Sequence, residues 1–252
     1  MHPARVVIVT GGGKGIGLGI GECFARKGDT VVVADVDLER AQQAAKELHQ
    51  FGGMACMGIR CNVADRASVK AMADEVDGRF ERIDVLVNNA GICPFIDIME
   101  MTPEVWQRTI DVDLSGPFHC TQIVARKMIA RGIKGRIIFI TSLADTMTGP
   151  SQVDYAAAKS GLRMEMAGFA IALAPQGITC NAVAPGHVNT DLTRHWWESP
   201  EGKAAIPKTV PLGRLGQPQD IGHACVYLAS EEGSYVNGIT LRVDGGNSVW
   251  NR

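Results

Sequence analysis

The chain has 252 residues, a length at which an open α/β sheet commonly folds as a single domain. Hydrophobic residues make up 46% of it and charged residues 21%, which excludes a disordered chain. The net charge of −2 gives no electrostatic reason to expect nucleic acid or an anionic membrane as a partner, so the expected ligand is a small molecule.

Short β-branched runs alternate with longer helix-like segments from one end of the chain to the other. This alternation is typical of repeated βαβ units and a parallel sheet. Several strand candidates are continuously apolar, as expected when helices cover both faces. The prediction is one α/β domain over residues 1–252, with a doubly wound, seven-stranded parallel sheet. The strands are predicted at 5–10, 30–35, 54–61, 85–88, 136–141, 179–183 and 239–243, and the helices at 16–28, 38–51, 66–80, 103–131, 153–174 and 218–230.

One long stretch, residues 187–217, has no clear periodicity and contains several prolines together with Trp196 and Trp197. A segment of this length inside a compact domain is usually a lid or a binding loop. We therefore expect a substrate-binding lid at about 187–217.

The sequence also gives expectations about location and metals. No apolar run approaches the roughly 18 residues of a membrane-spanning helix. A strand-like run begins already at Val6, which leaves no room for a signal peptide. The seven cysteines are scattered without a CxxC pair, so neither a disulfide framework nor a metal site is expected. The predicted location is the cytoplasm.

A glycine-rich turn, Thr10-Gly11-Gly12-Gly13-Lys14-Gly15-Ile16-Gly17, follows the first predicted strand directly and leads into a helix. Glycines allow a tight turn and close approach of a ligand. The free N–H groups and positive dipole of the helix N-terminus favour an anion such as a pyrophosphate. The turn thus predicts a dinucleotide site, with these contacts: Gly11, Lys14, Gly15, Ile16 and Gly17.

Asp35 ends the second predicted strand, close to the spacing of about 20 residues at which an acidic side chain reaches the ribose hydroxyls. A carboxylate there accepts hydrogen bonds from both hydroxyls and repels a 2′-phosphate. It therefore favours NAD. Lys14 acts in the opposite direction, because a cation in the turn could neutralise that phosphate, and NADP remains the alternative.

Tyr155 and Lys159 are four residues apart, hence on one face of a helix. They follow a predicted strand that leads into Ser142. The same chain carries Asn88-Asn89-Ala90-Gly91 after the fourth predicted strand. A Tyr-x-x-x-Lys pattern alone is common, but the combination is specific.

Together these motifs resemble the short-chain dehydrogenase/reductase family, over about residues 5–246. The resemblance implies a Rossmann-type fold and hydride transfer between a nicotinamide and a CH–OH group. By this resemblance Tyr155 is the general acid/base, Lys159 lowers its pKa and binds the nicotinamide ribose, and Ser142 holds the substrate oxygen. It also implies a homotetramer, in which the helices at 103–131 and 153–174 pair across interfaces. Further cofactor contacts that it implies are Asn62, Val63, Asn89, Ala90, Gly91, Pro185, Gly186, Val188 and Thr190.

These roles make physical sense. A phenol has a pKa of about 10 and is a poor base near neutral pH, so catalysis needs its anion to be stabilised. The Lys159 ammonium and a positive nicotinamide can both do this.

The chain departs from the family at one place. Asp113 stands where members usually carry an asparagine that holds a water relaying protons from the lysine. A carboxylate can accept from that water but cannot donate to it, and it could pair with Lys159 and weaken the lysine's effect on Tyr155. Our hypothesis is that Asp113 still serves the relay, as an acceptor.

Polar side chains near the predicted site favour a polyhydroxylated substrate, a sugar or a polyol. Trp196 and Trp197 could stack on a sugar face, although each such residue could equally be an ordinary loop residue or a packing contact. The alternatives are a 3-oxoacyl-thioester or other carbonyl reductase using NADPH, and a non-catalytic nucleotide-sensing protein. Besides Ser142 and Tyr155, the candidate substrate contacts are Asp145, Gln152, His187, Asn189, Arg194, His195 and Trp196.

Overall fold

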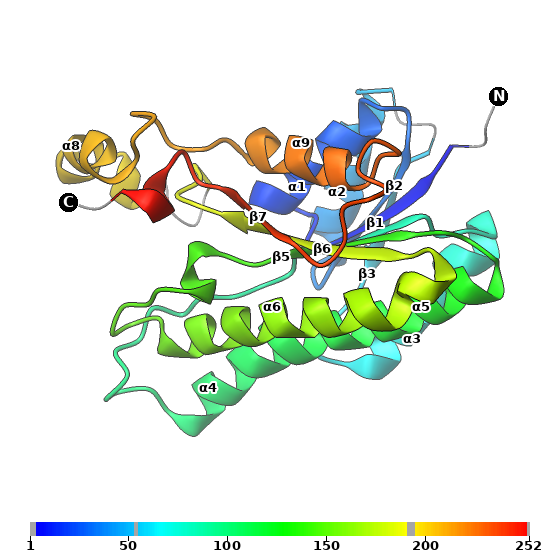
Figure 1. The fold of residues 1–252 in the computed structure, drawn as a ribbon, viewed down its shortest axis with the longest axis horizontal. Coiled ribbons are helices and arrows are strands. Elements are labelled where there is room, and N and C mark those ends of the chain that lie inside the picture. Colours follow the sequence, from blue (N-terminus) through cyan, green and yellow to red (C-terminus); the bar gives the residue numbers. More distant parts are fainter. Residues whose placement is uncertain (1–3, 53–54, 191–194, 251–252) are drawn as a thin grey trace.

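A computed structural model describes residues 4–52, 55–190 and 195–250 of the chain. A seven-stranded sheet, with every neighbouring pair parallel, runs through its centre in the order β3-β2-β1-β4-β5-β6-β7 (Figure 1). This confirms the predicted doubly wound α/β domain. The predicted start of the third strand, at 54, lies outside the described residues. The strands are β1 Val6–Thr10, β2 Thr30–Asp35, β3 Met57–Arg60, β4 Val85–Asn88, β5 Arg136–Ile140, β6 Thr179–Pro185 and β7 Thr240–Val243.

Helices cover both faces of the sheet. In Figure 1, α3, α4, α5 and α6 lie below it, and α1, α2 and α9 lie above it. Their bounds are α1 Gly15–Ala25, α2 Leu38–His49, α3 Arg66–Phe80, α4 Pro103–Ile110, α5 Gly116–Ala130, α6 Val153–Leu173, α8 Pro200–Thr209 and α9 Pro218–Leu228.

The apolar strands form two cores. Successive side chains of a strand point to opposite faces, so in β1 Val6 and Ile8 pack into the core with α3, α5 and α6. Val7 and Val9 pack into the core with α1, α2 and α9. The continuous apolar runs of the sequence are thus explained by a sheet buried on both faces.

The helix predicted at 103–131 is interrupted. Residues Asp111–Ser115 form a π-turn between α4 and α5. Pro117 lacks the N–H that would bond the Asp113 carbonyl in a regular α-helix, so the normal ladder cannot pass this point. Such wider turns are frequent at functional sites, and this one carries Asp113.

The predicted lid is not irregular throughout. It contains α8, whose N-cap Ser199 accepts a hydrogen bond from the Gly202 N–H at 3.0 Å. The helix was missed because it carries breakers, Pro207 and Gly202, in a short segment.

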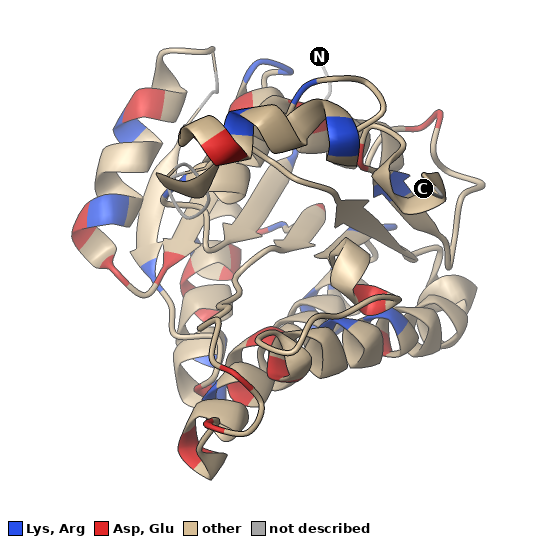
Figure 2. Ribbon diagram, turned by 90° about the vertical axis from the view of Figure 1, so that its left-hand side faces the viewer, with Lys and Arg blue, Asp and Glu red and all other residues tan. Residues whose placement is uncertain are grey.

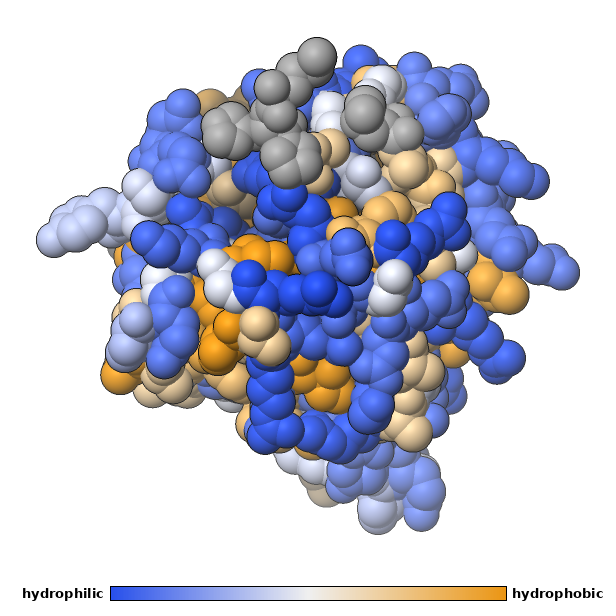
Figure 3. All heavy atoms as spheres, turned by 90° about the vertical axis from the view of Figure 1, so that its right-hand side faces the viewer, coloured by the Kyte–Doolittle hydropathy of each residue, from blue (hydrophilic) through white to orange (hydrophobic). Residues whose placement is uncertain are grey.

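Acidic and basic residues are interspersed along the helices of the side shown in Figure 2, in keeping with the net charge of −2. On the opposite side, hydrophilic residues cover most of the surface, with apolar side chains visible in hollows between them (Figure 3). Within the described residues, every helix is too short or too polar to cross a membrane.

Candidate active site

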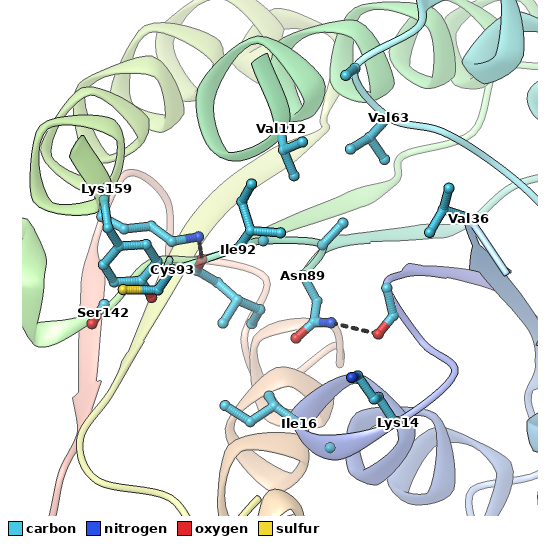
Figure 4. A pocket seen from close by; sticks show the side chains of 18 of the residues that line it. Lys14, Ile16, Val36, Val63, Asn89, Ile92, Cys93, Val112, Ser142 and Lys159 are labelled. Atoms are coloured by element: carbon cyan, nitrogen blue, oxygen red, sulfur yellow. Dashed lines mark hydrogen bonds between the residues drawn. The ribbon is translucent and has the colours of Figure 1, made fainter. Parts of the chain in front are cut away.

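A cavity of about 1020 Å³ opens at the carboxyl ends of the central strands. The strand order reverses between β1 and β4, and a crevice at that reversal is where open α/β sheets bind ligands. Figure 4 shows Lys159, Cys93 and Ser142 at one side of it, and Lys14, Ile16 and Val36 at the other. The cavity therefore joins the predicted catalytic group to the predicted cofactor turn.

The glycine turn is held tightly. Gly11 has a φ of +60° and Gly15 one of +55°, a region that favours glycine. A Cβ on Gly17 would lie 2.3 Å from the Gly11 carbonyl oxygen. Asn89 Nδ2 donates to the carbonyl oxygens of Thr10 at 2.9 Å and of Gly11 at 3.0 Å, tying the turn to the end of β4 (Figure 4).

This turn fits a dinucleotide. It is followed at once by α1, whose first turn contains no acidic residue, so its N-terminal N–H groups and positive dipole face the cavity without a competing carboxylate from that turn. The pyrophosphate can approach the backbone closely because side chains are missing at the glycines.

Asp35 closes the adenosine end of the cavity. Its carboxylate is buried and accepts hydrogen bonds from the Gly13 N–H at 3.1 Å and the Asp37 N–H at 3.2 Å. Arg40, which the sequence reasoning missed, lines the same end together with Lys14. Arg40 also pairs with Asp37 at 3.1 Å.

The three predicted catalytic side chains meet in the cavity. Ser142 follows β5, and its Oγ accepts from the Ala144 N–H at 3.1 Å. Tyr155 and Lys159 project from the first turns of α6. Lys159 is buried, donates to the Ile140 carbonyl oxygen at 3.1 Å, and has its Nζ 5.3 Å from the centre of the Tyr155 ring.

The pKa of Tyr155 is raised above that of an ordinary phenol. Burial is the largest cause, and Asp113 adds to it, while Lys159 and a hydrogen bond with Ser142 lower the pKa. Lysine alone therefore does not bring the phenol to a low pKa here. A positive nicotinamide, expected from the sequence, would act as a second cation beside the phenol.

Asp113 is fully buried behind the cavity wall, with its Oδ2 3.2 Å from Lys159 Nζ. Its Oδ1 accepts from the Ile92 N–H at 2.8 Å. Burial raises the pKa of Asp113, opposed by Lys159. Burial alone would lower the pKa of Lys159, but Asp113 and Tyr155 raise it. The predicted pairing of the two charges is present.

Gly91 lines the cavity and packs directly against this ion pair. A Cβ at Gly91 would lie 2.6 Å from Asp113 Oδ2 and 3.3 Å from Lys159 Nζ. The residue must be glycine because the buried pair takes the space of a side chain.

The prediction of Asp145 as a substrate contact is wrong. Its side chain is fully buried and lies 3.5 Å from Arg242 of β7. The 3-10 turn Leu143–Asp145 directs it under α6, where its carbonyl oxygen accepts from Ser160 Oγ at 3.0 Å. Gln152 does line the cavity.

The other described substrate candidates, on the 187–217 segment, are not among the residues that line the cavity. His187 packs against Trp197, with ring centres 4.8 Å apart, and burial lowers its pKa. Trp196 is half exposed and stands edge-on to Trp197. Asn189 N–H donates to the Gly216 carbonyl oxygen. His195 is exposed, and Arg194 lies outside the described residues. Their roles stay predictions.

The remaining cofactor candidates all line the cavity, and so do several residues that the sequence reasoning missed. Four of the missed ones follow the carboxyl ends of β2 and β4, where a parallel sheet builds its sites, so their position was the available signal. The other missed residues named below lie on α4 and at the start of the π-turn after it. Predicted lining residues are Asn62, Val63, Asn89, Ala90, Gly91, Pro185, Gly186, Val188 and Thr190; missed ones include Val36, Ile92, Cys93, Phe95, Glu104, Arg108 and Asp111.

Known proteins resemble the chain over nearly its whole length. A family profile described as "Enoyl-(Acyl carrier protein) reductase" matches residues 11–248. L-rhamnose 1-dehydrogenase (NAD(P)(+)) of Azotobacter vinelandii is 39% identical over 96% of each chain. The 3-oxoacyl-(acyl-carrier-protein) reductase FabG of Escherichia coli is 38% identical, also over 96% of each.

A solved structure agrees with these relatives. The gluconate 5-dehydrogenase from Burkholderia cenocepacia, in complex with NADP and tartrate, has a TM-score of 0.92 and 37% identity, covering 98% of this chain and 96% of that one. Other relatives include dehydrogenases of galactitol and threitol. The chain therefore belongs to the short-chain dehydrogenase/reductase family, as a nicotinamide-dependent oxidoreductase that acts on CH–OH groups.

Proposed function

We propose that the chain is an NAD-preferring dehydrogenase that interconverts a secondary alcohol or sugar hemiacetal of a sugar or polyol and the corresponding carbonyl. The observation that carries this proposal is the convergence of Ser142, Tyr155 and Lys159 in the cavity that also contains the glycine turn. The relatives named above act on sugars and polyols as well as on oxoacyl thioesters, which supports the substrate class.

The dinucleotide would lie along the glycine turn, held by Asn89 to Gly91 and by Pro185, Gly186 and Thr190. When bound, its nicotinamide supplies or accepts the hydride. In oxidation, the Tyr155 phenolate takes the proton of the substrate hydroxyl as the C–H hydride leaves. The Ser142 hydroxyl donates to the same oxygen while it carries negative charge. Reduction runs through the same contacts in reverse.

Lys159 acts as a fixed cation in this mechanism. Asp113 raises its pKa, so the ammonium stays protonated over a wide pH range. It then holds the nicotinamide ribose and stabilises the Tyr155 phenolate. Asp113, which lies behind Gly91, acts through Lys159 as a positioning residue and as the acceptor of the relay.

The preference for NAD rests on Asp35. Its buried carboxylate stands at the adenosine end of the cavity, where it would accept from ribose hydroxyls and repel a 2′-phosphate. Lys14 and Arg40 line the same end and favour the alternative, a carbonyl reductase using NADPH. We give Asp35 more weight because a buried charge is screened less than flexible cations at the rim.

A homotetramer in the cytoplasm is also proposed. The helices expected at the interfaces expose large apolar side chains, including Phe118 of α5 and Met164 and Ile171 of α6, the last 78% exposed. The cysteines are free thiols, most of them buried, which favours a reducing compartment.

A panel assay tests the proposal. The purified protein is mixed with NAD or NADP and with L-rhamnose, D-gluconate, galactitol, D-threitol or a 3-hydroxyacyl thioester, and nicotinamide absorbance is followed. Turnover of a sugar or polyol with NAD supports the proposal. Turnover restricted to the thioester with NADP would support the reductase, and dinucleotide binding without any turnover would support a sensing protein.

A further inference from the structure

The segment that follows Gly91 forms a fixed wall beside the catalytic group. It begins at Ile92, whose N–H donates to Asp113 Oδ1 at 2.8 Å. It is held again where the Ile98 N–H donates to the Pro150 carbonyl oxygen at 2.9 Å, next to the loop that carries Gln152. Both ends are thus anchored on elements that position Tyr155 and Lys159.

The wall continues through Cys93-Pro94-Phe95. Cys93 lies beside Lys159 in Figure 4 and lines the cavity. Burial raises the pKa of its thiol to about 11, opposed by a hydrogen bond that its sulfur accepts from the Phe95 N–H. This contact ties the backbone of Phe95 to Cys93, and both residues line the cavity.

Phe95 is held in an unusual conformation. Its φ is +55°, and among the described residues only one other non-glycine, Glu81, has a positive φ. For a bulky side chain this backbone region is strained, and strain of this kind clusters at functional sites. Half of the Phe95 side chain is exposed, although it lines the cavity together with Ser142 and Gln152.

Because half of the Phe95 side chain is exposed, burial in the protein core does not explain why its backbone is held at a positive φ. A flat apolar surface at the rim of a polar site is complementary to the C–H face of a sugar ring, while polar groups such as Gln152 suit its hydroxyls. An open-chain polyol is flexible and offers no such preformed flat face. It must therefore lose more conformational entropy than a cyclic sugar does when it stacks on the phenyl ring of Phe95.

We infer that Phe95 is a specificity-determining residue that stacks on the C–H face of a cyclic sugar, so that the site favours aldose rings over open-chain polyols. This inference rests on the proposed function and narrows its substrate class. Oxidation at the anomeric carbon of such a ring sends the hydroxyl proton to Tyr155 and the C–H hydride to the dinucleotide, and the carbon becomes a lactone carbonyl.

The test compares wild type, Phe95→Gly and Phe95→Tyr. Glycine removes the ring and also relieves the backbone strain, so loss of activity cannot be attributed to a strained loop. The measured quantities are kcat/KM for L-rhamnose and D-galactose and for galactitol and D-threitol, NADH affinity, and Tm. The matched control is Glu81→Gly, which relieves the same strain at the end of α3, where Glu81 is exposed and its N–H donates to the Asp77 carbonyl oxygen.

In Phe95→Gly, kcat/KM for the aldoses should fall about 10- to 100-fold, more than for the polyols, with NADH affinity unchanged and Tm not lowered. Phe95→Tyr should recover most of the loss, and Glu81→Gly should keep the kinetics of the wild type. Equal losses on both substrate classes, no loss, or a tyrosine variant as poor as glycine would overturn the inference. A wild type that turns over neither sugars nor polyols would instead refute the proposed function.

Discussion

Lys159 Nζ lies 3.2 Å from Asp113 Oδ2, so the cation that faces the catalytic phenol is paired with a buried carboxylate on its other side. The Asp113 carboxylate raises the pKa of both of its titrating neighbours, Lys159 and Tyr155. It keeps Lys159 protonated, but the negative charge raises the pKa of Tyr155.

Neutralising Asp113 should therefore shift the pH dependence of oxidation. The rate rises with pH as Tyr155 loses its proton. In Asp113→Asn the raising effect of the carboxylate on the pKa of Tyr155 is removed, so this rising limb should move to lower pH. The measurement is kcat against pH for the oxidative reaction. Asp113→Ala should change the profile too, and an unchanged profile in both variants would disprove the role of Asp113.

Changing Asp35 should alter the choice of dinucleotide. Asp35→Asn keeps an acceptor for the Gly13 N–H but removes the charge that opposes a 2′-phosphate, leaving Lys14 and Arg40. The ratio of kcat/KM with NADP to that with NAD should rise by about tenfold or more. Asp65→Asn is the control, because asparagine also caps a helix and Asp65, the N-cap of α3, lies outside the cavity lining among the described residues. Equal ratios in Asp35→Asn and wild type would refute the assignment of Asp35.

The glycine turn should tolerate no side chain at Gly17. In Gly17→Ala the added Cβ would lie 2.3 Å from the Gly11 carbonyl oxygen, so the turn must shift. We expect NADH affinity to fall about tenfold or more and stability to fall by about 1–3 kcal/mol. Gly78→Ala in α3 has open space, and it should stabilise the fold by about 0.5–1 kcal/mol without affecting binding. Titration calorimetry and thermal unfolding measure both effects.

A buried carboxyl on α6 should make stability depend on pH. Burial raises the pKa of Glu165 to about 8, above its usual value of about 4.3 in an unfolded chain. A raised folded pKa stabilises the fold at low pH, and this stabilisation is lost as the pH rises from about 4.3 through 8. The Tm of Glu165→Gln should therefore exceed that of the wild type by an amount that grows over this range and then levels off. A constant difference would contradict the assignment, and the exposed Glu75→Gln serves as control.

The sheet could be predicted from the sequence because its strands are apolar on both faces. The cofactor turn could be predicted because few other structures need glycines in that order directly after a strand. The interruption at Asp111–Ser115 was not predicted. The sequence shows Pro117 but not how the helix accommodates it; the structure shows that the hydrogen-bond ladder widens over these five residues.

A smaller share of the predicted substrate contacts than of the predicted catalytic residues lines the cavity. The pair Tyr155 and Lys159 is fixed by helical spacing, whereas the direction of Asp145 depends on the 3-10 turn after β5 and on Arg242, which is 97 residues away along the chain. Long-range ion pairs of this kind leave no local pattern. The wall at Phe95 was missed because a positive φ at phenylalanine has no sequence signal.

The most direct test of the mechanism is Tyr155→Phe. The variant loses the phenol oxygen that takes the substrate proton but keeps the ring against Lys159, so turnover in both directions should be abolished while NADH still binds with nearly unchanged affinity. The measurement combines steady-state turnover with a dinucleotide titration of the same preparation. Near-normal turnover in this variant would contradict the assignment of Tyr155 as the acid/base.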